Sequence, residues 1–438
     1  MPNHKIVSKE NALPFILVTA LFFLWAMPNN LNDILIPQFM KSFELTRFQA
    51  GLVQSAFYMG YFLMALPAAL VMDRFNYKTG LITGLLLFAT GALLFYPAAT
   101  IGKFELFLLA LFVIASGLAF LETGANSFIS VLGDPDTSAQ RLNFSQSFNP
   151  LGAMTGALIG SQFIFSGVEH SAAQVLSMKT AGTYNNYLNT EIMRVIPPYM
   201  IIGCIILVWA FLIWKVKFPA ETDNPVKPNG KTNDGHGHMK MLIKYPHFLK
   251  GILAQFFYVG AQVGTWSFLI QYVKDFIQKP EKEAGVYLVY ALMAFGIGRF
   301  VSTALMRKFQ PNKLMGVFSI INIGLTSIAI LHPGFFGVWA LVISSFFMSC
   351  MFPTIFALGV KGLGPNTKIG GSMIIMAIIG GAIWTPLMGY ISDSTHSMAL
   401  AMVIPVISYC YLVYYSFIGS KPSGPLFVGD EYKVVASH

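Results

Sequence analysis

Long apolar segments constrain the fold of this chain more than any other feature. Roughly twelve runs of about 20 apolar residues, each long enough to cross the membrane hydrocarbon as a helix, alternate with short polar breaks. Only 11% of the 438 residues are charged, against about 25% in a soluble domain. A β-barrel is disfavoured, because its strands would alternate polar and apolar residues. The sequence therefore predicts an all-α membrane protein with twelve spans, at residues 14–38, 48–71, 79–99, 104–131, 143–166, 197–216, 248–273, 284–306, 313–332, 335–360, 369–391 and 397–418.

The basic residues are distributed unevenly, which predicts an orientation. The net charge is +9. With the N-terminus in the cytoplasm, most Lys and Arg residues fall on the cytoplasmic side, as the positive-inside rule requires. We therefore expect no nucleic-acid partner. The first apolar run lacks a cleavage pattern and should stay in the mature protein. These features predict a multi-pass protein of the bacterial inner (plasma) membrane with both termini cytoplasmic.

One long polar segment, from Phe218 to Pro246, divides the apolar runs into two sets of six. Its Pro, Gly, Asn, Asp, His and Lys content is typical of a linker. The two halves are weakly similar, since Phe22-Phe23 matches Phe256-Phe257. Six spans plus six, as parallel repeats, is the plan of the major facilitator superfamily. We predict two six-helix bundles related by pseudo-twofold symmetry, with domains at 1–217 and 248–438 and a cytoplasmic linker at 218–247.

Cysteine and histidine give little support for a disulfide or a metal site. The three cysteines each lie within an apolar run and are interpreted as reduced packing residues. His236 and His238 lack further ligands at defined spacing, so a solvated linker is favoured over a metal site. No nucleotide-binding glycine loop is present. We expect no metal and no cofactor other than a proton as the coupling ion.

Two of the 19 acidic residues, Asp33 and Glu122, lie deep in predicted spans. A charge at that depth costs about 2.5 kcal/mol or more, and neither acid has a Lys or Arg close by in its span. Burial should favour the protonated carboxyl and bring proton exchange towards physiological pH. We predict both as proton-coupling residues. The alternative is that each is a structural hydrogen-bond donor joining helices.

Polar side chains recur along one face of four predicted spans, which indicates a polar cavity. Amides and carboxylates suit sugar hydroxyls, and an indole ring can stack on an apolar sugar face. The alternative is interhelical hydrogen bonding, worth only about 0.6 kcal/mol per contact. The predicted substrate-binding residues are Trp25, Asn29, Asn30 and Asp33 in the first span, Asn126 in the fourth, Gln146 and Asn149 in the fifth, and Gln255, Tyr258, Gln262 and Trp266 in the seventh; Asn32 and Asn143 share the same stripes.

Three further charged residues are predicted to act in gating. Arg299 lies about two turns above the cytoplasmic end of the eighth span, where snorkelling or an ion pair is favoured over substrate contact. Asp73 and Arg74 form a short charged turn after the second span. Gly152, Gly156 and Gly160, at fourfold spacing, predict close helix packing.

Several long motifs, spread over nearly the whole chain, carry a resemblance to a known family. They are WAMPNNLNDILIPQF (25–39), FQAGLVQSAFYMGYF (48–62), FLETGANSF (120–128), LNFSQSFN (142–149), AQFFYVGAQVGTWSFLIQY (254–272), FPTIFALGVKGLG (352–364) and IIGGAIWTPLMGYISD (378–393). The chain thereby resembles the L-fucose–proton symporter family of the major facilitator superfamily. The resemblance implies that Asp33 and Glu122 handle protons and sugar, that Gln146 and Asn149 line the cavity, and that the two halves rock to give alternating access.

The sequence departs from that family's pattern at Phe352, where a tyrosine is expected, at Gln271, where an arginine is expected, and at Ser127, where a proline is expected. These departures leave open which sugar is carried, and relatives in the wider family carry glucose, galactose or N-acetylglucosamine.

Together these observations predict a proton-coupled sugar symporter for L-fucose or a related hexose. Glu122 would exchange the proton, and Asp33 would bind a sugar hydroxyl and titrate in concert with it. The expected partners are a sugar, a proton and the lipid bilayer, with the protein a monomer. A sugar uniporter is the main alternative. An intramembrane aspartyl protease is disfavoured, because Glu122 lies in Leu-Glu-Thr-Gly rather than a Gly-x-Gly-Asp context, and no selectivity filter suggests a channel. We expect no enzyme activity.

Overall fold

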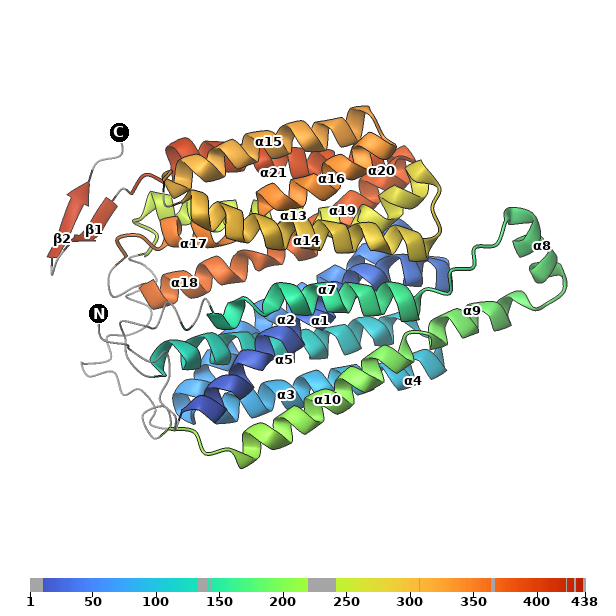
Figure 1. The fold of residues 1–438 in the computed structure, drawn as a ribbon, viewed down its shortest axis with the longest axis horizontal. Helices are drawn as coiled ribbons and strands as arrows, with labels where there is room; N and C mark the ends of the chain where they lie inside the picture. The colour runs from blue at the N-terminus through green and yellow to red at the C-terminus, as the bar shows by residue number, and fades with distance from the viewer. Residues whose placement is uncertain are drawn as a thin grey trace. The chain divides into compact units, whose positions relative to one another are not determined.

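The computed structural model describes residues 11–132, 141, 144–219, 242–306, 308–363, 367–422, 424–428 and 431–435. The chain forms two compact units (Figure 1). Unit 1 comprises Met1–Leu45, Ala56–Lys227 and Pro280–Val286; unit 2 comprises Thr46–Ser55, Pro228–Lys279 and Tyr287–His438. Each unit thus includes a short segment from the other half of the sequence. The predicted domain boundaries at 217 and 248 stay a prediction.

The helices of unit 1 follow the first six predicted spans. They are α1 (Ala12–Ser42), α2 (Arg47–Arg74, whose first residues belong to unit 2), α3 (Tyr77–Leu93), α4 (Phe95–Ile101), α5 (Phe104–Val131), α7 (Asn149–Ile159) with a π-helical turn at Gly160–Ile164, α8 (Ala172–Thr180), α9 (Tyr184–Met193) and α10 (Ile196–Lys215). The short helices α8 and α9 were not predicted, because their sequence is polar and has no membrane-length apolar run.

The helices of unit 2 follow the last six spans. They are α13 (Pro246–Ile277), α14 (Glu281–Leu305, whose first residues belong to unit 1), α15 (Pro311–Leu331), α16 (Phe335–Met348), α17 (Met351–Gly359), α18 (Thr367–Met376), a 3₁₀ turn at Ala377–Ile379, α19 (Gly380–Thr395), α20 (Met398–Ala401) and α21 (Val403–Tyr414) with a π-helical turn at Tyr415–Gly419. A two-stranded antiparallel hairpin, β1 (Gly424–Val428) with β2 (Glu431–Val435), follows them and was not predicted.

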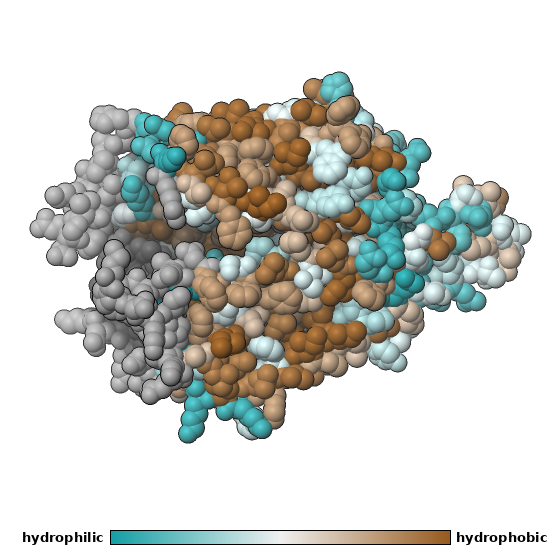
Figure 2. Space-filling view, viewed as in Figure 1, coloured by the Kyte–Doolittle hydropathy of each residue, from teal (hydrophilic) through white to brown (hydrophobic). Residues whose placement is uncertain are grey.

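Ten helical segments in the described part of the chain are long and apolar enough to cross a membrane. The two remaining predicted spans are occupied by α13, which has 32 residues, and by α7 with its π-helical turn. Apolar side chains cover much of the surface that Figure 2 shows along the helices. Trp214, Phe300 and Phe336 are 62%, 71% and 75% exposed. Apolar surface on this scale is stable in lipid and not in water, so the chain is a multi-pass membrane protein.

Glycines allow the helices of unit 1 to touch backbone to backbone. A Cβ at Gly117 of α5 would collide with the Gly84 carbonyl and the Phe88 amide of α3. Cβ atoms at Gly152 and Gly156 of α7 would collide with backbone carbonyls of α1. The prediction that these fourfold-spaced glycines permit close packing is therefore confirmed.

Replacing Gly117 with valine should destabilise unit 1 by about 1–3 kcal/mol, because two backbones would have to separate. Gly324→Val in α15 is the matched control, since no atom lies within 4 Å of a Cβ at Gly324. Thermal unfolding in detergent measures both. Equal melting temperatures for the two variants would contradict the packing argument.

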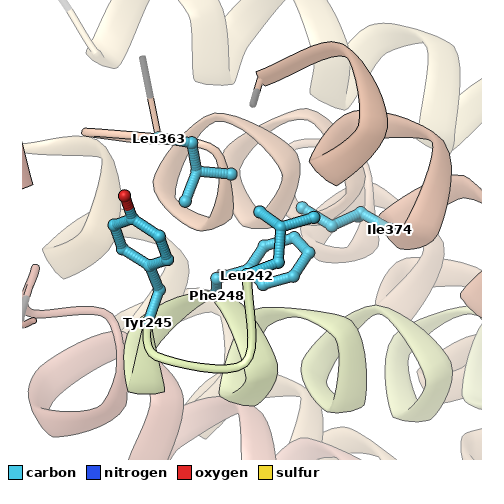
Figure 3. Packing of buried hydrophobic residues seen from close by; sticks show 5 residues of the cluster. All are labelled: Leu242, Tyr245, Phe248, Leu363 and Ile374. Atoms are coloured by element: carbon cyan, nitrogen blue, oxygen red, sulfur yellow. The ribbon is translucent and has the colours of Figure 1, made fainter. Parts of the chain in front are cut away.

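A small apolar cluster packs around the start of α13 in unit 2 (Figure 3). Tyr245 and Phe248, at the start of α13, pack there with Leu363 and Ile374. The His247 ring nitrogen also lies 2.8 Å from the Lys361 carbonyl oxygen. These contacts fix the start of α13 and thereby the direction of the helix that carries Gln255, Tyr258 and Gln262.

Candidate functional site

Asp33 lies in the last third of α1, beyond a proline that interrupts the helix hydrogen bonds. Pro28 has no N–H, so one backbone carbonyl of the preceding turn loses its helical partner. Two residues further on, Asn30 is buried and donates through Nδ2 to the Ala26 carbonyl at 3.0 Å. Asp33 is only 4% exposed. The first acid therefore lies on a polar but largely dry stretch of helix.

Glu122 lies on α5 at the end of a short amide chain. Asn126, one turn along, donates through Nδ2 to the Glu122 backbone carbonyl at 2.9 Å. Gln146 donates through Nε2 to Asn126 Oδ1 at 3.2 Å. Glu122, Asn126 and Gln146 are all partly exposed. The structure thus brings together three of the predicted residues on a partly accessible face of unit 1.

Two tyrosines of α2 complete this face, and the sequence analysis missed both. Tyr58 is close enough to interact electrostatically with both Asp33 and Glu122. The Tyr61 hydroxyl faces Glu122 and Asn29. The two rings are stacked, with centroids 6.3 Å apart. The tyrosines therefore link the two acids, which come from different helices.

This site can hold a proton without a fixed counter-ion. Glu122 makes no ion pair within the described part of the chain, so no charged side chain there holds it in the ionised form. Carboxyl, amide and phenol groups, each able to donate or accept, lie together on this partly exposed face. Such a set can exchange a proton and bind hydroxyl groups at the same place.

The remaining predicted residues of unit 1 have partners of their own. Asn149 donates weakly to the Phe22 carbonyl at 3.5 Å. Trp25 is 3% exposed and packs on Phe22, with ring centroids 4.4 Å apart. Residues 147 and 148 form a turn before α7 begins, so Gln146 and Asn149 do not share one continuous helix as predicted. Asn143 lies outside the described residues.

The four predicted residues of α13 differ in their hydrogen bonds and in their exposure. Tyr258 donates to the Met348 carbonyl at 3.0 Å, where α16 ends. Trp266 donates to Ser345 Oγ at 3.0 Å and meets Phe295 edge to face. Gln255 is fully buried, and neither of its amide atoms has a hydrogen-bond partner. Gln262 is partly exposed. Sugar contact by these four residues stays a prediction.

The predicted gating residues form no ion pair in the described structure. The Arg299 guanidinium lies over the Phe295 ring, 5.2 Å from its centroid, and its Nε is buried without a hydrogen-bond partner. Arg74 is exposed and lies 5.7 Å from the Phe75 ring centroid. The Asp73 side chain lies outside the described part of the molecule.

Charged clusters occur instead where α1 ends and α2 begins. In unit 2, Arg47 pairs with Asp275 at 2.6 Å and donates to Ser392. The Asp393 carboxylate accepts the backbone N–H groups of Arg47 and Phe48, at 3.1 and 2.8 Å, and so caps the first turn of α2.

A second cluster lies in unit 1. Lys41 is 3.2 Å from Glu191 and 3.9 Å from Glu281, and it also donates to Ser166 Oγ at 3.0 Å. These partners are far apart in sequence, so periodicity could not have paired them.

The described residues contain no group of three His, Cys, Asp or Glu side chains that could hold a metal ion. His236 and His238, considered above as ligands, lie outside the described residues.

The fold and site together define a polytopic helical membrane protein in which one tyrosine lies near two acids from different helices. A family model described as Major Facilitator Superfamily matches residues 16–370, and the chain belongs to this family. Its fold has twelve transmembrane helices, and its members are transporters, so the protein is not an enzyme.

The relatives carry more specific descriptions. The L-fucose-proton symporter of Escherichia coli (strain K12) is 44% identical over 414 residues, which cover 94% of this chain and 93% of that protein. The glucose/galactose transporter of Brucella abortus (strain 2308) is 34% identical over 425 residues, covering 96% and 98%. The crystal structure of the E. coli fucose:proton symporter matches with a TM-score of 0.70 and 42% identity, covering 93% and 98%. The predicted resemblance to fucose–proton symporters is confirmed.

Proposed function

We propose that this protein is a proton-coupled sugar symporter for L-fucose or a related hexose, working by alternating access. The observation that carries the proposal is that Tyr58 lies near two acids of membrane-spanning helices in unit 1, the buried Asp33 and the partly exposed Glu122. Relatives described as an L-fucose-proton symporter and as a glucose/galactose transporter support a sugar as substrate.

In this scheme Glu122 takes up the proton and Asp33 binds a sugar hydroxyl. The proton neutralises Glu122, and the sugar hydroxyl donates a charge-assisted hydrogen bond to the Asp33 carboxylate. Neither acid is then left as an unpaired charge when the polar face passes through a closed, water-poor state. Releasing the sugar exposes the site to water on the other side, where the carboxyl can ionise again. Sugar and proton then cross in one cycle.

The departures Phe352 and Gln271 bear on sugar choice in different ways. Phe352 lies beside Tyr258, with ring centroids 6.4 Å apart, and offers no hydroxyl there. Gln271 donates to Asp275 at 2.9 Å, so it supports the Arg47 pair. Phe352 is therefore the stronger candidate for altering the sugar preference, with fewer hydrogen bonds to hydroxyls on that side.

Counterflow in proteoliposomes tests this function. We expect labelled L-fucose or D-galactose to exchange, with the two sugars and D-glucose and N-acetylglucosamine as competitors. We also expect sugar addition to carry protons into the vesicles, measured with an internal pH dye. Sugar accumulation that is insensitive to a protonophore would instead support the uniporter alternative. The absence of any sugar exchange would refute the proposal.

Alternating access requires contacts that form and break, and the Arg47–Asp275 pair is our candidate. The start of α2 is held in unit 2, while the helix continues in unit 1 from Ala56. A movement of the first turn of α2 away from α13 and α19 would break the ion pair and the Asp393 cap.

Reversing one charge of this pair, by Arg47→Asp or Asp275→Arg, should lower the transport rate about 5- to 150-fold. This factor corresponds to about 1–3 kcal/mol of coupling. The reciprocal exchange should recover part of the rate, because it restores opposite charges. Initial rates of counterflow measure all three variants. A double variant no better than the single ones would contradict the role of this ion pair.

We further propose the bacterial inner membrane as the location, with both termini cytoplasmic, and a monomer in the bilayer as the working unit. The distribution of basic residues and the long apolar helices support this placement.

A further inference from the structure

The Tyr61 hydroxyl is buried in unit 1 without a settled hydrogen bond. The residue is 8% exposed, and its oxygen has no partner at standard length and angle. It nevertheless lies close enough to interact with both the Glu122 carboxyl and the Asn29 side chain. Leaving a buried hydroxyl without a hydrogen bond costs free energy. The polar groups next to Tyr61 are therefore the candidates for its hydrogen bonds during the transport cycle.

The packing of α2 holds this hydroxyl in place. Gly60 lies against α5, where a Cβ would be 2.7 Å from the Phe112 carbonyl oxygen. The Tyr61 ring packs against the rings of Phe57 and Tyr58, at centroid distances of 5.6 and 6.3 Å. The ring therefore has little freedom to turn its hydroxyl away from Glu122.

The polar groups around Glu122 are few in the described part of unit 1. Tyr58 and Tyr61 face it from α2, and Tyr58 is also close to Asp33 of α1. On its own helix Asn126 binds the Glu122 backbone. Tyr61 is the group placed to donate a hydrogen bond to the Glu122 carboxylate itself.

We propose that Tyr61 is a positioning residue for the proton step, in which the Asn29 amide donates to the Tyr61 oxygen and the Tyr61 hydroxyl donates to ionised Glu122. The inference rests on the proposed role of Glu122 as the proton-exchanging group. A donor aimed at a carboxylate stabilises its charged form, and such bonds tighten when the charge appears. Tyr61 thereby assists proton release, and it ties α2 to the protonation state of α5.

The test is the pH dependence of counterflow with labelled L-fucose and with labelled D-galactose. Exchange needs a protonated Glu122, so it should fail at alkaline pH. Tyr61→Phe should move the midpoint of this loss to higher pH by about one unit, because without the donor the carboxyl holds its proton more tightly. Asn29→Leu should move it in the same direction by less.

The matched control is Tyr199→Phe, which removes another buried, unpartnered hydroxyl of unit 1. It should leave the midpoint unchanged. Glu122→Gln separates the two proposals, since it should abolish the alkaline loss. If it does so while Tyr61→Phe and Asn29→Leu keep the parent midpoint, the role of Tyr61 is refuted and that of Glu122 stands. If Glu122→Gln keeps the alkaline loss, the proposed proton site itself fails.

Discussion

Replacing Glu122 with glutamine should abolish uphill sugar uptake and leave sugar exchange intact. Glutamine has the shape of a protonated glutamate but cannot release a proton. The loaded carrier can therefore still cross, whereas the step that ties net transport to the proton gradient is lost. We expect proton-driven uptake to fall by roughly 100-fold or more, the range of a lost proton-transfer group.

Two assays on one preparation test this expectation: uptake driven by an imposed pH gradient, and counterflow at equal pH. Glu105→Gln is the matched control, because Glu105 also lies on α5 but is exposed in its first turn. It should keep both activities. Wild-type uphill uptake by Glu122→Gln would remove Glu122 from the proton path, and loss of both activities would indicate a structural role instead.

The spans were predictable from the sequence because the hydrocarbon thickness fixes the length of an apolar helix. The same argument cannot locate breaks within a span. The predicted helix at 335–360 is interrupted after Met348, and the Tyr258 hydroxyl donates to the Met348 carbonyl there. Such a break depends on a hydrogen-bond partner from another helix, and the composition of the span itself does not predict that partner.

The acids of the site were predictable because a carboxyl at bilayer depth is rare. Tyr58 and Tyr61 were not, since tyrosine is common in membrane helices and its placement depends on which face of α2 meets α5. Gly60 determines which face of α2 meets α5, because it lies in close contact with the Phe112 backbone, and only the structure shows this contact. Lys41 and Glu191 could not be paired from the sequence either, because these residues of α1 and α9 meet across a long sequence separation.

The surroundings of Arg299 could not be predicted for a different reason, because an uncharged partner can compensate its charge. Sequence reasoning expected snorkelling or an ion pair, because a lone charge within a span needs compensation. In the described structure its guanidinium lies over the Phe295 ring, while snorkelling and a role in gating stay predictions. An aromatic face can stabilise a cation without any charge, so a search for acidic partners alone overlooks it.

Replacing Asp33 with asparagine should weaken sugar binding and also lower proton-driven uptake. The side chain keeps its size, so packing around this 4% exposed position should hold. What disappears is a charge-assisted hydrogen bond to a sugar hydroxyl, worth about 1.5–3 kcal/mol, and hence roughly tenfold or more in affinity. Because Asp33 and Glu122 both lie near Tyr58, the change should also alter how Glu122 titrates.

The concentration dependence of counterflow separates Asp33 from Glu122. Asp33→Asn should raise the half-saturating sugar concentration, whereas Glu122→Gln should leave it close to the parent value. Asp33→Glu is the informative companion, since it keeps the charge but moves it by one methylene, and it should retain coupling at reduced affinity. An Asp33→Asn protein with parental affinity and full uphill uptake would show that this acid only joins helices, which is the structural alternative that the sequence left open.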